Sequence, residues 1–258
     1  MTTPTSPIAA PEAGAAFTDD RLLGGRVRLR QPQAGYRAAI DPVFLAAAVP
    51  ACASDHVLDL GTGAGAAALC LAVRTGCAVT GLEIDPAMAA LARANAVANE
   101  IGGRFTIIEG DVNVPGADLA GFSHAMANPP FRDSGQGSPS PNAGKRGATV
   151  SGAAGLQPWV DLAVRAVRPG GTVTFVYRAD RLPELLAMMP IVAGDVVALP
   201  LWPRAGADAG RVLVQARVGG KGPFRLSAGL VVHDPNGPYT REAEAVLRGG
   251  AAMDLSRA

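Results

Sequence analysis

The stretch VLDLGTGAG at residues 57–65 decides the fold, because a short apolar strand there runs into a glycine turn that opens a helix. Its glycines, Gly61, Gly63 and Gly65, follow a G-x-G-x-G spacing. Glycine lets a ligand approach the main chain closely. An acid, Asp59, stands two residues before the first glycine and would repel the pyrophosphate that a G-x-G-x-x-G loop binds. The pattern favours a ligand that carries an ammonium or sulfonium group.

On both sides of this loop, apolar strands alternate with helix-like segments. The predicted strands are 56–60, 78–84, 104–110, 122–127, 172–178, 196–200 and 211–218. The predicted helices are 64–75, 86–100, 159–168, which stops at Pro-Gly-Gly, and 178–189. Asp41 before Pro42 and Asp85 before Pro86 have the pattern of helix N-caps, and the first of these is expected to open a helix through Val49. Apolar strands separated by helices are typical of a parallel sheet that is covered on both faces. We therefore expect an α/β, Rossmann-like fold with a doubly wound, mostly parallel sheet and helices on both faces.

The flanking segments complete a single domain. Residues 1–17 are rich in Pro, Ala and Thr and are expected to form a disordered tail. Arg26, Arg28 and Arg30 alternate with apolar residues, which predicts a strand with its arginines on one face. The expected domain covers 18–258, and its parts are an N-terminal hairpin and helix (18–54), the core (55–220) and a C-terminal extension (221–258).

Composition narrows the class of protein further. Of the 258 residues, 48% are apolar and 17% are charged, which excludes a disordered or collagen-like chain. The net charge of +1 provides no global basic field. The three cysteines, Cys52, Cys70 and Cys77, form no C-x-x-C pair, so reduced thiols and no zinc site are expected. No apolar run is long enough to span a membrane and no signal peptide is visible, so we expect a cytoplasmic protein.

Acidic residues follow the next two predicted strands. Glu83 ends the second strand, and its carboxylate can accept hydrogen bonds from both hydroxyls of a ribose. Asp111 follows the third strand and could accept from an adenine amino group. Each acid alone could equally cap a helix or turn. Together with Asp59 behind a glycine loop, they describe a site for an adenosine with an amino-acid tail, which is S-adenosylmethionine.

The tetrapeptide NPPF at 128–131 ends the fourth predicted strand, at the same sheet edge as the glycine loop. The Asn128 side-chain oxygen and the Pro129 carbonyl are acceptors for a planar amino group. Pro129 and Pro130 stiffen the turn, and Phe131 offers a ring on which a base can stack. An amine held in this way can attack a methyl group in line, a reaction that depends on orientation and needs no metal. The alternative is a rigid turn with a core phenylalanine.

These motifs resemble those of known enzymes. DLGTGAGA, GLEIDPAM and EGD resemble motifs I to III of class I S-adenosylmethionine-dependent methyltransferases over roughly residues 55–178. NPPF resembles motif IV of the amino-methyltransferases, whose general form is (Asp/Asn)-Pro-Pro-(Tyr/Phe/Trp). That motif is shared by enzymes acting on adenine N6, on guanine N2 in ribosomal RNA and on glutamine in release factors. The resemblance therefore implies a planar amine as the methyl acceptor.

A second resemblance narrows the substrate. GYRAAIDP at 35–42 and the chain after 200 are similar to the bacterial tRNA(Val) adenine-37 N6-methyltransferases of the "methyltransferase small" group, over about residues 18–250. This implies an RNA adenine-N6 methyltransferase acting on a tRNA anticodon-loop adenine. In that family an early aspartate and its helix close over the cofactor, a role carried here to Asp41, whose alternative is a plain helix N-cap. Tyr is common where this chain has Phe131, so guanine-N2 methylation of RNA stays open, followed by glutamine N5-methylation of a protein.

RNA affinity requires contacts to phosphates. The candidates are the stripe of Arg26, Arg28 and Arg30, together with Arg132 and Lys145-Arg146 in a Gly/Ser/Pro-rich segment after the NPPF motif. Their alternative is a set of ordinary solvated charges. We expect a monomer with RNA, most simply tRNA, as its partner. The alternative from another class is a non-catalytic nucleotide-binding module or a dinucleotide oxidoreductase, against which the G-x-G-x-G spacing and NPPF argue.

Overall fold

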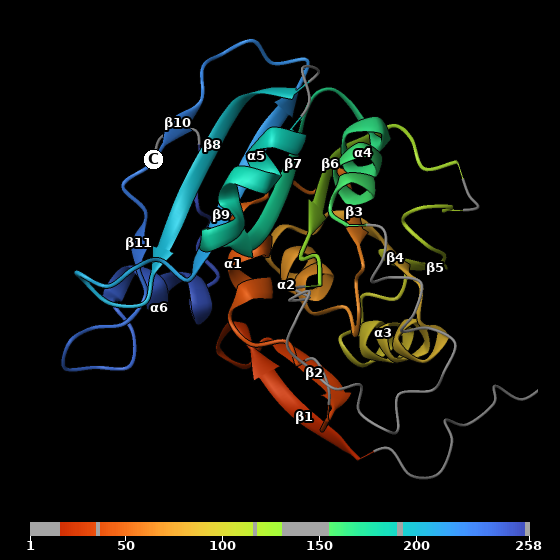
Figure 1. Ribbon diagram of the computed structural model, residues 1–258. Coiled ribbons are helices and arrows are strands. Elements are labelled where there is room, and N and C mark those ends of the chain that lie inside the picture. The colour runs from red at the N-terminus through yellow and green to blue at the C-terminus, as the bar shows by residue number, and fades with distance from the viewer. Residues whose placement is uncertain (1–15, 35–36, 116–117, 131–154, 190–192, 256–258) are drawn as a thin grey trace, which may run out of the picture.

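A nine-stranded sheet forms the centre of the molecule (Figure 1). The computed structural model describes residues 16–34, 37–115, 118–130, 155–189 and 193–255. The sheet's strands are β3 (His56–Leu60), β4 (Ala78–Glu83), β5 (Phe105–Glu109), β6 (Phe122–Ala127), β7 (Val167–Arg178), β8 (Ala193–Trp202), β9 (Arg211–Val218), β10 (Arg225–Leu226) and β11 (Leu230–Val231). Their order is β10-β8-β9-β7-β6-β3-β4-β5, with β11 also paired to β8. Among these strands only β9 runs antiparallel to its neighbours, which confirms the expected mostly parallel sheet.

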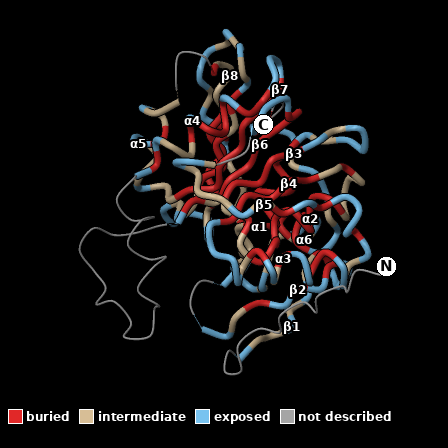
Figure 2. Tube along the Cα trace, turned by 90° about the vertical axis from the view of Figure 1, so that its right-hand side faces the viewer, coloured by how far each residue is buried: buried red, intermediate tan, exposed pale blue. Residues whose placement is uncertain are grey.

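Helices cover both faces of the sheet, and each face has its own core. The helices are α1 (Asp41–Ala48), α2 (Ala66–Thr75), α3 (Pro86–Ala98), α4 (Gln157–Ala166), α5 (Leu182–Met188) and α6 (Arg241–Leu247), with 3-10 turns at Leu23–Gly25 and Ala179–Arg181. One buried cluster includes side chains of α1, α2, α3 and α6, and the other includes those of α4 and α5. Figure 2 shows the buried residues concentrated along the central strands. No helix in the described ranges is long and apolar enough to cross a membrane.

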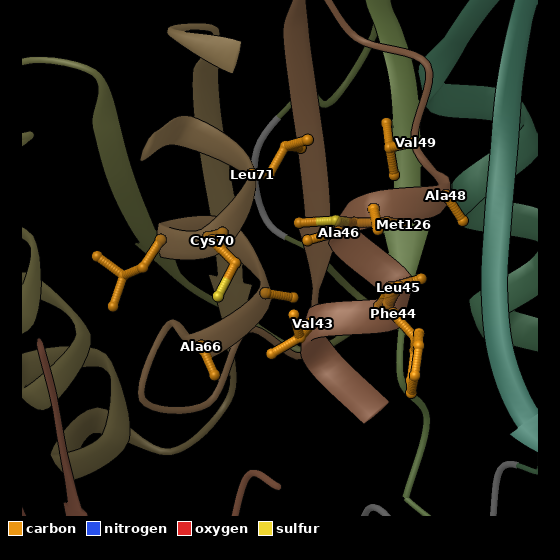
Figure 3. Packing of buried hydrophobic residues seen from close by; sticks show 14 of the residues in the cluster. Val43, Phe44, Leu45, Ala46, Ala48, Val49, Ala66, Cys70, Leu71 and Met126 are labelled. Carbon is orange, nitrogen blue, oxygen red and sulfur yellow. The ribbon is translucent and has the colours of Figure 1, made fainter. Parts of the chain in front are cut away.

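The first helix attaches the N-terminal element to the core. Figure 3 shows Val43 and Ala46 of α1 beside Cys70 of α2 and Met126 of β6, all within one buried cluster. Small side chains on α1 and α2 allow close packing of the two helices. Cys70 and Cys77 are buried free thiols, as expected for core side chains, and burial raises the pKa of Cys70 to about 12.

The N-terminal hairpin pairs β1 (Phe17–Leu22) with β2 (Val27–Pro32) in antiparallel register. Val27 and Leu29 are buried while Arg28 and Arg30 are exposed, which confirms the predicted alternation for these residues. Arg26 was wrongly included in the strand, because it lies in the turn before β2, where its side chain donates to the carbonyls of Leu23 and Gly249. Residues 1–15 of the expected tail lie outside the described residues. Phe17, however, already belongs to β1, because its backbone pairs with Pro32, so the predicted boundary of the tail was too late.

Two further local predictions were wrong. The helix expected to run from 159 to the Pro-Gly-Gly at 169–171 already ends at Ala166, because Val167 adopts an extended conformation and pairs with Phe122 of β6. Burial of the Val167 side chain against the second core therefore overrides its helical neighbours. Asp41 is not the N-cap of α1: Ile40 takes that position, without a side-chain cap, and Asp41 lies in the first turn. The predicted cap of α3 is confirmed, since the Asp85 carboxylate accepts hydrogen bonds from two backbone N–H groups of the first turn.

Candidate active site

The glycine turn between β3 and α2 forms one side of the site. Gly61, Gly63 and Gly65 all have positive φ angles, of 64°, 57° and 88°. A side chain at Gly61 would also meet the Trp159 ring at 2.5 Å, whereas the nearest atom to a Cβ at Gly63 is the Met88 methyl at 3.9 Å. Gly61 is therefore required by close packing, whereas a Cβ at Gly63 would be near only the far end of the Met88 side chain, so a ligand can approach the main chain there.

Two buried carboxylates lie at this turn. Asp59 is only 2% exposed and accepts a hydrogen bond of 2.6 Å from the Thr62 hydroxyl. Burial raises the pKa of Asp59 to about 7, the Glu83 carboxylate adds to the rise, and the Thr62 hydrogen bond opposes it. Glu83 accepts hydrogen bonds from the backbone N–H of Gly63 at 2.7 Å and of Asp85 at 2.9 Å. Burial raises the pKa of Glu83 as well.

In the described part of the chain, no arginine, lysine or histidine forms an ion pair with either acid. Two acids without a basic partner at a buried turn form a site that is suited to a cationic ligand. Each oxygen of the Glu83 carboxylate accepts one backbone hydrogen bond. Because a carboxylate can accept about four, Glu83 can still accept hydrogen bonds from ligand hydroxyls.

A pocket adjoins the glycine turn beyond the ends of β4 and β5. The space between its lining atoms is about 340 Å³ and includes open solvent at the mouth of the pocket. Its lining residues are Gly61, Leu82, Ile84, Gly110, Asp111, Val112, Asn113 and Trp159. Asp111 lines this pocket just after the end of β5, and its role toward a cofactor stays a prediction. Its Oδ1 accepts hydrogen bonds from the backbone and side-chain amide groups of Asn113.

Sequence reasoning missed the apolar walls of this pocket. Ile84 and Val112 directly follow the acids Glu83 and Asp111, so their position after two predicted strand ends was an available signal. Trp159 had no such signal, because it comes from the first turn of α4, nearly 100 residues after Gly61. An aromatic ring with aliphatic neighbours and one acid suits a flat heteroaromatic ligand group.

The end of β6 brings the NPP segment to the same edge. Ala127 pairs with Leu60 of β3, so Asn128 follows β6 where Gly61 follows β3. Asn128 is half-buried, Pro129 is buried and Pro130 is exposed. Phe131, Arg132, Lys145 and Arg146 lie outside the described residues, and their roles stay predictions.

The contacts that Asp41 forms do not place it at the glycine turn. Its carboxylate accepts a hydrogen bond of 2.8 Å from Nε of Arg211, at the start of β9, in an ion pair that is half-buried. The pair joins α1 to a strand 170 residues away. A cofactor role for Asp41 therefore stays a prediction.

Comparison with known proteins identifies the class. A family model described as "Methyltransferase small domain" matches residues 39–143. A structure of a predicted O-methyltransferase from Agrobacterium tumefaciens is similar with a TM-score of 0.70 and 26% identity, over 83% of this chain and 98% of that one. A Thermus thermophilus 16S rRNA N2 G1207 methyltransferase, solved with AdoMet and guanosine, shares the fold at a TM-score of 0.57 and 23% identity, over 81% of this chain and 52% of that one. The fold and the glycine turn define a class I S-adenosylmethionine-dependent methyltransferase.

Sequence relatives narrow the class to a family. A tRNA1(Val) (adenine(37)-N6)-methyltransferase from Porphyromonas gingivalis is 32% identical over 203 residues, which cover 73% of this chain and 76% of the relative. A Shewanella amazonensis protein of the same name is 37% identical over 124 residues, 47% of this chain and 52% of the relative. The chain belongs to the tRNA1(Val) (adenine(37)-N6)-methyltransferase family.

Proposed function

We propose that this protein transfers a methyl group from S-adenosylmethionine to the N6 amino group of an adenine in RNA, within a tRNA anticodon loop. The observation that carries the proposal is the position of Asn128-Pro129-Pro130 at the end of β6, directly beside the glycine turn that ends β3. Methyl-donor and amine sites at neighbouring strand ends place the two reactants side by side, which is the main requirement of an in-line displacement.

The acceptor groups at the end of β6 orient the amine. The Asn128 side-chain oxygen and the Pro129 carbonyl accept the two N–H hydrogens of a planar amino group, which leaves the nitrogen lone pair free to attack. Prolines on either side of that carbonyl restrict the backbone, so the acceptors need little reorganisation. Because the nitrogen becomes cationic as the bond forms, these hydrogen bonds strengthen toward the transition state. Phe131 is the predicted stacking partner of the base.

The residues around the glycine turn fit the cofactor. Asp59 faces the cationic amino-acid end, Glu83 accepts from the ribose hydroxyls, and the pocket of Ile84, Val112 and Trp159 takes the adenine. When bound, S-adenosylmethionine supplies a methyl group on a sulfonium, which is electrophilic without a metal. Burial of both acids in the ligand-free protein supports a cationic occupant.

The relatives' names support adenine in a tRNA as the substrate. An unpaired loop base also costs least to turn out of its stack into a pocket. Guanine-N2 methylation of RNA is the second candidate, because the Asn128 site recognises a planar amine and phenylalanine occupies position 131. Such an enzyme would work in the cytoplasm, where tRNA is modified.

The proposal is tested by methyl transfer from labelled S-adenosylmethionine into bulk bacterial tRNA, ribosomal RNA and protein, followed by digestion and identification of the modified nucleoside. N6-methyladenosine in the tRNA fraction is the expected product. N2-methylguanosine in ribosomal RNA, or label in protein, would keep the fold and cofactor but overturn the substrate.

Replacing Glu83 by alanine should weaken the binding of S-adenosylmethionine by about 10- to 100-fold, because hydrogen bonds to a buried charged group are lost. Calorimetric titration measures the affinity. The matched control is Glu109→Ala at the end of the neighbouring strand, where the carboxylate is exposed and pairs with Arg93 at 2.7 Å. Equal affinities for the two variants would contradict the ribose role of Glu83.

Replacing Trp159 by alanine should weaken S-adenosylmethionine binding by about tenfold, because an aromatic wall of the adenine pocket is removed. The chain has only two tryptophans, Trp159 and Trp202. Trp202 lies at the end of β8 and donates to the Ala228 carbonyl, so Trp202→Phe is the control. In that variant all tryptophan fluorescence comes from Trp159, and cofactor addition should change it. An unchanged spectrum at saturating cofactor would show that Trp159 does not line the occupied pocket.

A further inference from the structure

The exposed face of the β1–β2 hairpin concentrates positive charge. Arg21, Arg28 and Arg30, here called the arginine face, are exposed residues on one side of this two-stranded sheet. Residues 17–37 contain five arginines and two aspartates, although the whole chain has a net charge of only +1. The charge is therefore local to this element and is hidden in the overall balance.

The arginine face is not explained by the stability of the hairpin. Arg21 and Arg28 lie directly opposite each other across the two strands. Like charges at such positions are destabilising. Within the described ranges neither arginine forms an ion pair, whereas Arg30 pairs with Asp19 at 3.2 Å. Two opposed guanidinium groups without a carboxylate between them are suited to an external anion.

Two asparagines, Asn95 of α3 and Asn99 at its C-cap, hold the backbone of β2 beside the active site. Asn99 Oδ1 accepts from the backbone N–H of Arg28 and its Nδ2 donates to the Arg28 carbonyl, as a neighbouring strand would. Asn95 forms the same pair of hydrogen bonds with Arg30. Nδ2 of Asn95 also donates to the Ala64 carbonyl at 2.9 Å, within the glycine turn. The strand that carries the arginines is thus connected to the cofactor loop through one side chain that is 2% exposed.

The hairpin also lies at the edge of the sheet where the parallel strands end. In Figure 1 it is below the sheet, on the side to which the β8 arrow points. β8 runs parallel to β6, because both β7 and β8 are antiparallel to β9 and β7 is parallel to β6. The hairpin that carries the arginine face therefore lies on the side of the sheet where the strands leading to Asn128 and the glycine turn end.

We propose that the arginine face binds the phosphate backbone of the RNA whose target base enters the Asn128 site. This inference rests on the proposed function. Guanidinium groups form paired hydrogen bonds with phosphate oxygens and are suited to a repeating anion. The rigid asparagine contacts set the position of this backbone contact relative to the cofactor. An acidic protein surface is the other partner that three arginines suit, and the test separates the two.

The test compares the double variant R21Q/R28Q with R165Q/R168Q. The control removes the same charge from the exposed end of α4 and the start of β7, which lie at the edge of the sheet opposite to the hairpin (Figure 1). Binding of unmodified tRNA is measured over a range of salt concentrations. We expect R21Q/R28Q to bind about tenfold more weakly at low salt, with a slope of log affinity against log salt reduced by about two. The control should bind as the wild type does.

Activity and stability measurements exclude a merely structural effect. At saturating RNA, R21Q/R28Q should keep the wild-type kcat and show only a higher KM for RNA. Its Tm should be equal to or above that of the wild type, because a like-charge pair is removed. R21K/R28K, which keeps both charges, should retain most of the salt dependence.

Different results identify which proposal fails. If the wild type methylates RNA and R21Q/R28Q binds tRNA as tightly as the control, the arginine face does not contact RNA. A lower kcat at unchanged affinity would also overturn it. If the wild type instead methylates protein, and R21Q/R28Q weakens the binding of that protein, then the face docks an acidic partner. In that case the proposed RNA substrate is wrong as well.

Discussion

Replacing Asn128 by alanine should reduce kcat by about 10²- to 10³-fold, close to the background rate, and leave the affinity for S-adenosylmethionine nearly unchanged. The side-chain oxygen of Asn128 is buried at the end of β6. Its neighbour Ala127 pairs with Leu60 of β3, which places Asn128 at the edge of the sheet where β3 leads into the glycine turn. The alanine variant lacks the Asn128 side-chain oxygen, an acceptor whose hydrogen bond strengthens as the amine becomes cationic. The loss should therefore appear in the transition state more than in cofactor binding.

Single-turnover methyl transfer and cofactor titration on the same preparation measure the two effects separately. Asn128→Asp is the matched variant, because a carboxylate oxygen of nearly the same shape can still accept from the amine. It should keep measurable activity. Wild-type turnover in Asn128→Ala would show that the residue does not hold the amine. An equal loss of cofactor affinity would assign Asn128 to the cofactor instead.

Replacing Asp59 by asparagine should weaken S-adenosylmethionine binding and remove most of its pH dependence. Burial raises the pKa of Asp59 to about 7, so this carboxyl group is partly protonated near neutrality in the ligand-free protein. A cationic ligand prefers the ionised form. In the wild type, affinity should therefore fall by up to about tenfold for each pH unit below 7 and level off above it. Asp59→Asn should follow a flatter curve at a lower affinity.

The raised pKa of Asp59 also predicts how the free energy of unfolding changes with pH. The pKa of Asp59 is higher in the folded protein than its ordinary value of 3.8, so the folded state binds the proton more tightly than the unfolded chain. Its contribution to the free energy of unfolding is therefore present below about pH 4 and is lost as the pH rises through 7. The loss amounts to roughly 4 kcal/mol at most. Ligand-free Asp59→Asn should accordingly have a higher Tm than the wild type at pH 8.

Thermal unfolding at several pH values, with and without cofactor, checks both predictions. Asp161→Asn is the control, because Asp161 is an exposed residue on α4 whose side chain accepts from Gln157. A wild-type affinity that is constant from pH 5.5 to pH 8 would contradict a titrating Asp59 at the cationic end of the ligand.

Local patterns predicted most of the elements around the site. The glycine turn, Glu83 and Asp111 each follow an apolar strand, and parallel strands bring their carboxyl ends to one edge. Asp85 before Pro86 begins α3 as expected, because the cap depends only on its own turn. The Asp41 cap had the same local pattern and was wrong, since Asp41 lies within α1 and its carboxylate is engaged by Arg211 of β9.

The sequence by itself determined the alternation of strands and helices around the cofactor, the glycine turn with its acids and the position of the NPP segment at the same sheet edge. All of these follow from strand periodicity and from residues next to strand ends. Only the tertiary structure decided that Trp159 closes the pocket and that Asn95 ties the arginine face to the Ala64 carbonyl. It also decided that Asp41 pairs with Arg211. These contacts join residues separated by 31 to 170 positions. Such pairs depend on how helices and strands pack against one another, and no local spacing encodes that packing.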